Sequence, residues 1–157
     1  GNAMSTFTAQ NVGAGKINRV KEGYRMCYVI VLTAGAVLCV MYQLAGGAFV
    51  SLFLDSGSSE AYSVGLSYVK FLSFFYSFIG LKASTDGLLR GAGDVTAFTV
   101  ANLVNLAIRV SVTNLFAPIY GIQVAWMAVP LGWAANYVIS FGWYLTGKWK
   151  KVRVIKK

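Results

Sequence analysis

Long runs of apolar residues without a charge dominate the chain. Residues 26–54 form a stretch of 29 positions without Asp, Glu, Lys or Arg, and residues 110–147 form another of 38. A helix that crosses a membrane needs about 20 predominantly apolar residues. The pattern therefore predicts an all-α, polytopic membrane protein and excludes an ordinary soluble domain.

Short polar segments divide the apolar sequence into four full spans. We expect spans at residues 26–54, 61–83, 95–117 and 122–146, separated by loops at 55–60, 86–94 and 118–121. These loops are rich in the residues that form turns. Residues 1–12 read as the end of an earlier helix, and residues 147–157 as a basic tail. Pro130 should kink the last span, because proline removes one backbone donor.

The charges set the expected topology. The net charge is +9, and 12 of the 14 basic residues lie before the first span, around the loop between the second and third spans (Lys82 and Arg90), or after the fourth span. The loops at 55–60 and 118–121 carry none. Cytoplasmic loops of membrane proteins are enriched in Lys and Arg. We therefore expect a multi-pass protein of the plasma (inner) membrane with a cytoplasmic C-terminus, and no nucleic-acid partner.

Several chemistries lack the residues they need. The chain has no His, and Cys27 and Cys39 lie twelve residues apart in one predicted helix, about 18 Å by helical rise and beyond the reach of a disulfide. We expect no enzyme, no metal site and no cofactor. The five acids, Glu22, Asp55, Glu60, Asp86 and Asp94, are expected in loops or at span ends. A proton or sodium relay normally uses an embedded carboxylate, which this pattern does not supply.

Polar side chains nevertheless fall inside the spans, where a charge at mid-helix costs about 2.5–3.5 kcal/mol. On the second and third spans they share one helical face, which suits either helix packing through small residues or the wall of a substrate path. The path candidates are Lys70, Ser73, Ser77, Asn102, Asn105, Arg109 and Asn136. We predict that Lys70 and Arg109 face protein or cavity. We also predict one concave side with Asn102, Asn105 and Arg109 near its floor and Lys70 close by.

Three segments resemble motifs of the multidrug and toxic compound extrusion (MATE) transporters. Residues 9–16 (AQNVGAGK) look like the loop after the second helix of a lobe, and residues 89–94 (LRGAGD) resemble the LRGxGD loop between its fourth and fifth helices. Residues 120–122 (YGI) and 125–133 (AWMAVPLGW) resemble the start of the last helix of the second lobe. The motif-loop positions are Gln10, Asn11, Gly13, Gly15, Arg90, Gly91, Gly93 and Asp94.

The resemblance implies a twelve-helix transporter with two six-helix lobes, which exports cationic or amphiphilic drugs in exchange for sodium or protons. This sequence would be the C-terminal part of the second lobe, from the end of the eighth helix to the twelfth. Its partners would be the lipid bilayer, the missing N-terminal lobe and small-molecule drugs. Some members bind the coupling cation through an Asp in the tenth helix. The matching position lies near Ile79 and has no carboxylate within a turn, so the coupling ion is expected to bind outside this sequence.

Two other functions stay open from the residues alone. A lipid or polysaccharide flippase of the same superfamily fits the embedded cations Lys70 and Arg109. A small self-standing membrane protein that anchors or scaffolds a partner fits the four spans.

The predicted topology can be tested by cysteine accessibility. Single cysteines at Ser58 and Lys151 should be labelled from opposite sides of the membrane, because an odd number of spans separates them. Labelling of both positions by an impermeant reagent from the same side would contradict the alternation.

Overall fold

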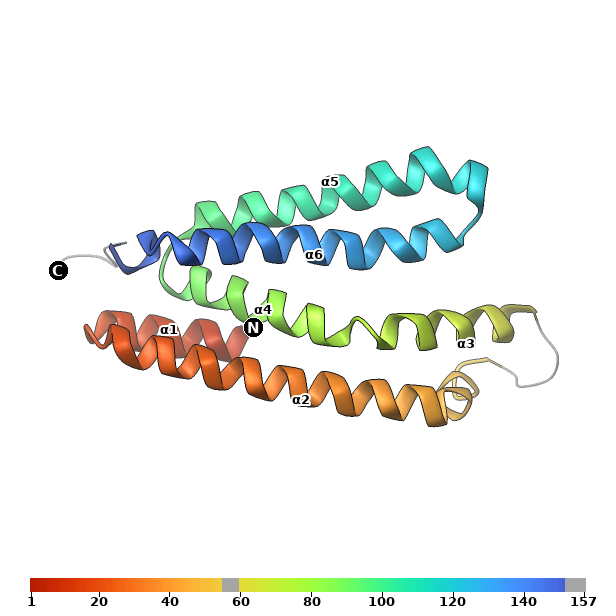
Figure 1. Ribbon diagram of the computed structural model, residues 1–157, viewed down its shortest axis with the longest axis horizontal. Helices are drawn as coiled ribbons and strands as arrows, with labels where there is room; N and C mark the ends of the chain where they lie inside the picture. Colours follow the sequence, from red (N-terminus) through yellow and green to blue (C-terminus); the bar gives the residue numbers. More distant parts are fainter. Residues whose placement is uncertain (55–59, 152–157) are drawn as a thin grey trace.

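The computed structural model describes residues 1–54 and 60–151, and its described elements are all helices. They are α1 (Asn2–Gly13), α2 (Ile17–Val50), α3 (Glu60–Ser73), α4 (Tyr76–Gly91), α5 (Val95–Tyr120), α6 (Gln123–Leu145) and the 3-10 turn η1 (Lys148–Lys151). They form an elongated bundle, with the α5–α6 hairpin on one side of α4 and the α1–α2 pair on the other (Figure 1).

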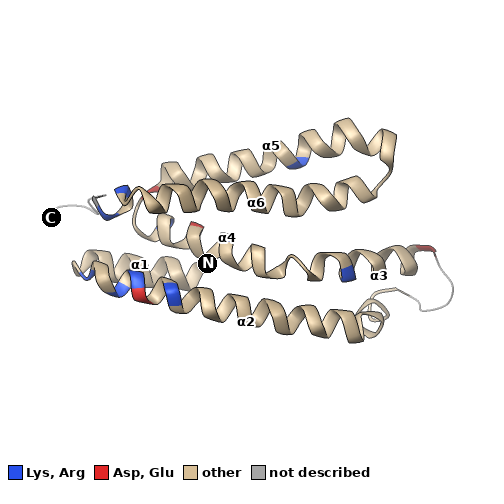
Figure 2. Ribbon diagram, in the orientation of Figure 1, with Lys and Arg blue, Asp and Glu red and all other residues tan. Residues whose placement is uncertain are grey.

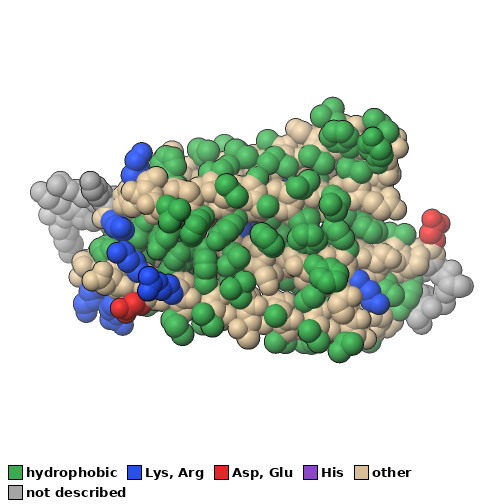
Figure 3. Space-filling model, in the orientation of Figure 1, with side chains coloured by type: hydrophobic (Ala, Val, Ile, Leu, Met, Phe, Trp, Pro, Cys, Tyr) green, Lys and Arg blue, Asp and Glu red, His purple; other side chains and the backbone are tan. Residues whose placement is uncertain are grey.

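The bundle has the dimensions and the surface of a membrane protein. Helices α2, α5 and α6 are each long and apolar enough to cross a membrane, and α3 with α4 makes a fourth crossing if the bent pair counts as one span. Large apolar side chains stay exposed along these helices, such as Leu44 of α2 (84%) and Val138 of α6 (68%). Hydrophobic side chains are spread along the length of the face shown in Figure 3. The predicted all-α membrane bundle is confirmed.

The expected second span, residues 61–83, is wrong as a single helix. The chain breaks at Phe74 and Phe75, where α3 and α4 meet at 56°. Helix α4 then continues to Gly91, so most of the loop expected at 86–94 is helical. Its glycines and charges suggested a loop, but the structure uses them inside the helix, as described below.

Two other boundaries differ from the sequence-based expectation. Helix α2 begins at Ile17 instead of residue 26, so its basic residues lie on its first turns. Helix α5 runs through Pro118 to Tyr120, and the turn expected at 118–121 shrinks to Gly121 and Ile122. Gly121 has a φ of +83°, a conformation that only glycine adopts without strain.

Two of the glycine motifs are helix C-caps of the same design. Gly15 and Gly93 have φ values of +70° and +85°. At the first, Lys16 N–H donates to Asn11 O at 2.7 Å; at the second, Asp94 N–H donates to Leu89 O at 2.9 Å. The left-handed glycine and this six-residue hydrogen bond together define a Schellman motif. The cap ends each helix and turns the chain into the next one.

A third glycine lets two helices touch. Gly91 of α4 lies against the backbone of α1, and a Cβ at this position would overlap the Ser5 backbone oxygen. The absent side chain thus sets the distance between α1 and α4.

Charge gathers at one end of the bundle. Lys and Arg cluster where α1 joins α2, where α4 joins α5 and where α6 ends (Figure 2). The end of α2, the start of α3 and the α5–α6 connection lie at the opposite end (Figure 1). Lys82 departs from the expected pattern: it lies within α4 and its side chain is only 16% exposed. Part of the predicted outer loop (55–59) and of the basic tail (152–157) lies outside the described residues.

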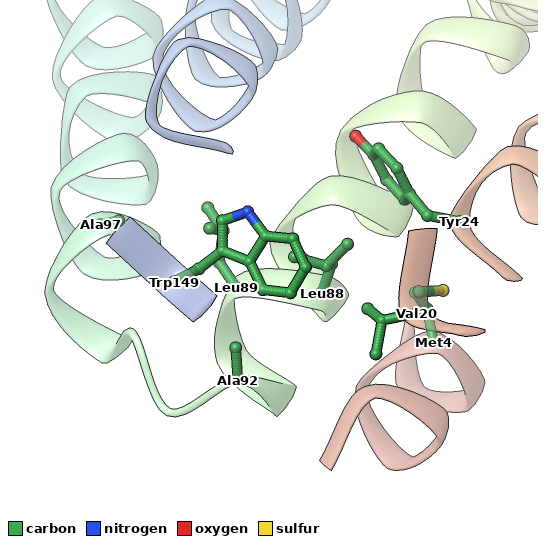
Figure 4. Close-up of a cluster of buried hydrophobic side chains, with 8 residues drawn as sticks. All are labelled: Met4, Val20, Tyr24, Leu88, Leu89, Ala92, Ala97 and Trp149. Atoms are coloured by element: carbon green, nitrogen blue, oxygen red, sulfur yellow. The ribbon is translucent and has the colours of Figure 1, made fainter. Parts of the chain in front are cut away.

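The main hydrophobic cluster also lies at the basic end (Figure 4). Trp143 and Tyr144 of α6 pack against this cluster. Its buried members come from α1, α2, α4, α5, η1 and the turn after α4, and are Met4, Val20, Tyr24, Leu88, Leu89, Ala92, Ala97 and Trp149. Trp149 is fully buried, its ring stacks on Tyr144, and its Nε1–H donates to the Tyr144 backbone oxygen at 3.1 Å. The start of the expected basic tail is thus part of the core.

Replacing Gly91 with Ala should destabilise the protein by about 1–3 kcal/mol, because the added methyl group forces α1 away from α4. Gly13→Ala is the matched control: a Cβ there meets no atom within 4 Å and its φ is not positive. Thermal unfolding in detergent measures both. Equal effects of the two substitutions would show that the α1–α4 contact is not tight.

Candidate functional site

The small residues of α3 and α4 form the interface with α2. Ser73, 1% exposed, accepts a hydrogen bond from Gln43 Nε2 at 2.9 Å. A Cβ on Gly35 would lie 2.5 Å from Ser77 Oγ. Farther along, Ser84 Oγ lies 3.1 Å from Cys27 Sγ. These contacts run in opposite order along α2 and along α3 and α4, as in an antiparallel helix pair. Helix packing was the first of the two alternatives given for this face.

Hydroxyl groups extend this interface toward α6. Thr85 of α4 lies 2.6 Å from the Tyr24 hydroxyl and 2.9 Å from the Tyr28 hydroxyl, both on α2. Tyr28 in turn donates to the Tyr137 hydroxyl of α6 at 3.2 Å. This chain of hydroxyls connects three helices, and no motif in the sequence pointed to it.

Lys70 also lies against α2. Its stem passes 3.8 Å from the position of a Cβ on Gly46, and the side chain is half-buried. The described residues give its ammonium group no hydrogen bond or ion pair. Another face of α3 carries Tyr68 and Phe71, whose rings contact Trp126 of α6. The α5–α6 hairpin therefore lies on a different side of α3 from Lys70.

The most elaborate polar site is a buried cluster around Asp86. Its carboxylate makes the one ion pair among the described residues, 2.9 Å from Lys82 Nζ one turn earlier on α4. Ser140 of α6 donates to the second carboxylate oxygen at 2.6 Å. Asn102 of α5 accepts from Lys82 at 3.0 Å and donates to Asp86 at 3.3 Å. One carboxylate thus binds groups from three helices.

The expectation that Asp86 lies in a loop or at a span end is wrong. The residue is 4% exposed and sits more than a turn inside α4. The pair Lys82 and Asp86 at i, i+4 was the available signal, because residues with this spacing are neighbours on a helix. The glycines that follow Asp86 concealed it by suggesting a loop.

Two buried amides border this cluster and the α5–α6 interface. Asn136 is fully buried, and its Nδ2 has no hydrogen-bond partner among the described residues. Asn105 Oδ1 is likewise buried without a partner there and lies directly over Gly132 of α6. Both amides were predicted from the sequence as polar residues inside spans.

Arg109 lies outside this cluster. Its stem crosses Gly132 of α6, where a Cβ would lie 2.9 Å from Arg109 Cγ. Beyond it, an open groove of about 410 Å³ runs between α5 and α6, and its lining includes Arg109, Thr113, Asn114, Ala125 and Ala128. The side chain is exposed and makes no ion pair within the described residues.

The structure does not bring the seven path candidates together on one concave side. Ser73, Ser77 and Lys70 lie against α2, whereas Asn102 and Asn136 border the Asp86 cluster. Asn105 and Arg109 lie at the α5–α6 interface. Lys70 is therefore not the neighbour of Arg109 that we expected. A role of these residues in a substrate path stays a prediction.

The charged residues of the LRGAGD motif fasten the basic end of the bundle. Arg90 Nη2–H donates to Asn2 Oδ1 at 2.7 Å, which ties α4 to α1. Asp94 accepts from Ala97 N–H at 3.4 Å as the N-cap of α5, and from Trp143 Nε1–H of α6 at 2.7 Å.

In the first motif, residues 9–16, Asn11 is buried and donates to Phe7 O at 2.8 Å, while Gln10 is exposed.

These features define a polytopic α-helical membrane protein that holds charged and amide groups between its helices. Residues 1–132 match the MatE family. The match covers most of the chain, and the chain belongs to this family.

Two relatives from Bacillus subtilis (strain 168) match nearly the whole chain. The probable multidrug resistance protein YpnP is 28% identical over 155 residues, which cover 98% of this chain and 34% of the relative. The probable multidrug resistance protein YoeA is 23% identical over 159 residues, covering 99% and 34%. The chain thus spans about a third of the length of these curated relatives. No solved structure matches it.

We expect Asp86→Asn to lower the free energy of unfolding by about 3–5 kcal/mol, because it leaves Lys82 buried without a counter-charge. The double variant Lys82→Met, Asp86→Asn should recover about 0.5–3 kcal/mol of this loss. Chemical unfolding in detergent measures the cycle. Glu22→Gln, at an exposed acid on α2, is the control. Additive losses in the double variant would contradict the ion pair.

Proposed function

We propose that this chain is the C-terminal part of the second lobe of a multidrug efflux antiporter in the plasma membrane. The observation that carries the proposal is the MatE match over residues 1–132, together with two relatives named as probable multidrug resistance proteins. The transported molecules would be amphiphilic or cationic drugs.

The cavities of the chain support a path for amphiphilic molecules. Beside the break between α3 and α4, an apolar cavity of about 130 Å³ is lined by residues that include Phe75, Phe78 and Pro130. The groove at Arg109 offers polar and apolar walls side by side. Transporter sites typically lie near the bilayer midplane where helices are interrupted, and the break at Phe74 and Phe75 is such an interruption.

The proposed protein has twelve helices in two lobes, and four of its spans lie in this chain if α3 and α4 make one bent crossing. The N-terminal lobe is the proposed partner, because the curated relatives are about three times as long as the matched region. The basic end of the bundle would face the cytoplasm, since Lys and Arg are enriched on that side of membrane proteins.

Export would be driven by sodium or protons, with the coupling ion bound outside these 157 residues. Asp86 is the one acid found within the bundle interior in the described ranges, and it is already neutralised by Lys82. The described residues contain no group of three or more His, Cys, Asp or Glu that could hold a metal ion. We place the coupling site elsewhere in the proposed transporter, because Asp86 already has Lys82 as its counter-charge.

Transport by the full-length protein in vesicles tests the proposal. With an inward-directed sodium or proton gradient imposed separately, one of the two should drive export of a fluorescent drug, and dissipating that gradient should abolish it. Absence of drug movement under either gradient would contradict the proposed function.

The 157 residues alone should not transport drugs, because alternating access needs two halves that move against each other. Reconstitution of the isolated chain, beside the full-length protein as positive control, measures this. Export by the isolated chain would require two copies to replace the two lobes, and would contradict the proposed two-lobe mechanism.

A further inference from the structure

One face of α2 changes from charged to apolar along its first turns. Lys16, at the N-cap, and Arg19 come first, and Gly23, Cys27 and Ile30 follow. At 3.6 residues per turn, these five positions fall within about 80° of one another around the helix axis. The two cations therefore lie on the same face as the apolar residues and nearer the basic end of the bundle.

An apolar groove of about 260 Å³ lies on this face, between α1 and α2. Its lining includes Ala3 and Phe7 of α1 and Gly23, Met26 and Ile30 of α2. The two helices approach closely at Gly23, where a Cβ would overlap the Phe7 ring. The groove thus offers a hydrocarbon chain apolar contacts from two helices.

The two basic residues above the groove have no counter-charge. Lys16 and Arg19 are exposed and form no ion pair among the described residues. Glu22, the one acid in residues 14–27, forms none there either. Both cations line an open pocket of about 300 Å³ at the turn between α1 and α2. Lysine and arginine are the side chains that bind phosphate groups, arginine in a bidentate manner.

The distance along α2 corresponds to one leaflet of a bilayer. Arg19 and Ile30 are eleven residues apart, about 16 Å along the helix axis, and half of the hydrocarbon core of a bilayer is about 15 Å. Arg19 lies at the end of the bundle where most basic side chains gather (Figures 2 and 3). The groove therefore runs from the membrane surface toward the midplane.

Topology alone does not explain this arrangement. Enrichment of Lys and Arg on the cytoplasmic side accounts for basic residues at this end of the bundle. It does not require that two of them share a helix face with an apolar groove. An anionic headgroup above a hydrocarbon chain fits both parts of the face, because its charge and its apolar part are arranged in the same order.

We propose that Lys16 and Arg19 bind the phosphate of an anionic phospholipid, and that one of its acyl chains lies in the groove between α1 and α2. A headgroup with net negative charge is favoured, because a choline headgroup carries its own ammonium group to neutralise the phosphate. The bound lipid would bridge α1 and α2 beside the loop at residues 9–16. The proposal goes beyond the transport function and does not depend on which molecules are transported.

Native mass spectrometry of the full-length protein tests the headgroup. The probes are phosphatidylglycerol and phosphatidylcholine with the same acyl chains, and the wild type should bind phosphatidylglycerol more tightly. Lys16→Gln with Arg19→Gln should weaken phosphatidylglycerol binding by about tenfold or more, because each basic residue near an anionic membrane surface contributes about fivefold in affinity. Unchanged phosphatidylcholine binding shows that the double variant is folded.

A second double variant removes the same charge from the same end of the bundle. Lys148 and Lys150 lie over the rings of Trp143 and Trp149, 5.2 and 5.7 Å from the ring centroids, and do not line the groove. Lys148→Gln with Lys150→Gln should leave the phosphatidylglycerol affinity unchanged. Equal losses in the two double variants would show diffuse attraction to the basic end and would overturn the proposed site.

Photo-crosslinking tests the position of the acyl chain. Phosphatidylglycerol with a diazirine in one acyl chain should label residues within 3–7 and 23–30, which contribute the groove lining. Ala3→Phe should reduce this labelling severalfold, because the added ring fills the groove from an exposed position. Ala9→Phe is the control, at an exposed position of α1 outside the groove. Labelling only at other segments, or labelling that Ala3→Phe does not reduce, would overturn the proposal.

A soluble phosphate ester separates the lipid from a free anion. Excess glycerol phosphate should not displace the photoreactive lipid, because it has no chain to occupy the groove. Displacement at millimolar concentration would show that Lys16 and Arg19 bind a soluble phosphate ester, and would overturn the lipid site.

Discussion

A carboxylate inside a membrane bundle must find its counter-charge and hydrogen bonds among the helices, because no bulk water supplies them. Asp86 meets this requirement with Lys82 on its own helix, Asn102 on α5 and Ser140 on α6. A shift of any of the three helices along its axis would break one of these contacts. The cluster therefore fixes the register of α4, α5 and α6, and with it the groove that the α5–α6 hairpin forms around Arg109.

Much of this arrangement follows from the sequence, and the exceptions have physical causes. The charge-free runs identified α2, α5 and α6, since hydropathy and length suffice for a membrane helix. The sequence has no proline or glycine at Phe74 and Phe75 that would predict the break there. Asp86 was misplaced because the sequence does not distinguish glycines that allow close helix packing from glycines that form turns. Sequence alone also could not show that Lys70 and Arg109 belong to different helix pairs, since this depends on how the helices pack.

The glycine motifs combine two roles that a sequence pattern does not separate. Gly15 and Gly93 have positive φ angles and end helices, whereas Gly91 lies in regular helix and lets α1 approach α4. Arg90 and Asp94 then bind groups from α1 and α6 around the same turn. The LRGAGD segment of a MatE protein is thus a structural joint in this chain, in which each charged residue has a partner.

The hydrophobic cluster around Trp149 has a consequence for how the bundle opens. Local unfolding starts where few apolar contacts are buried, and the buried hydrophobic cluster lies at the basic end, where α1, α2, α4, α5 and η1 meet (Figure 4). Resistance to amide exchange is then graded along the bundle axis, highest beside Leu88 and lowest toward the α5–α6 turn. The bundle is therefore expected to be most stable at its basic end and most easily deformed at the opposite end.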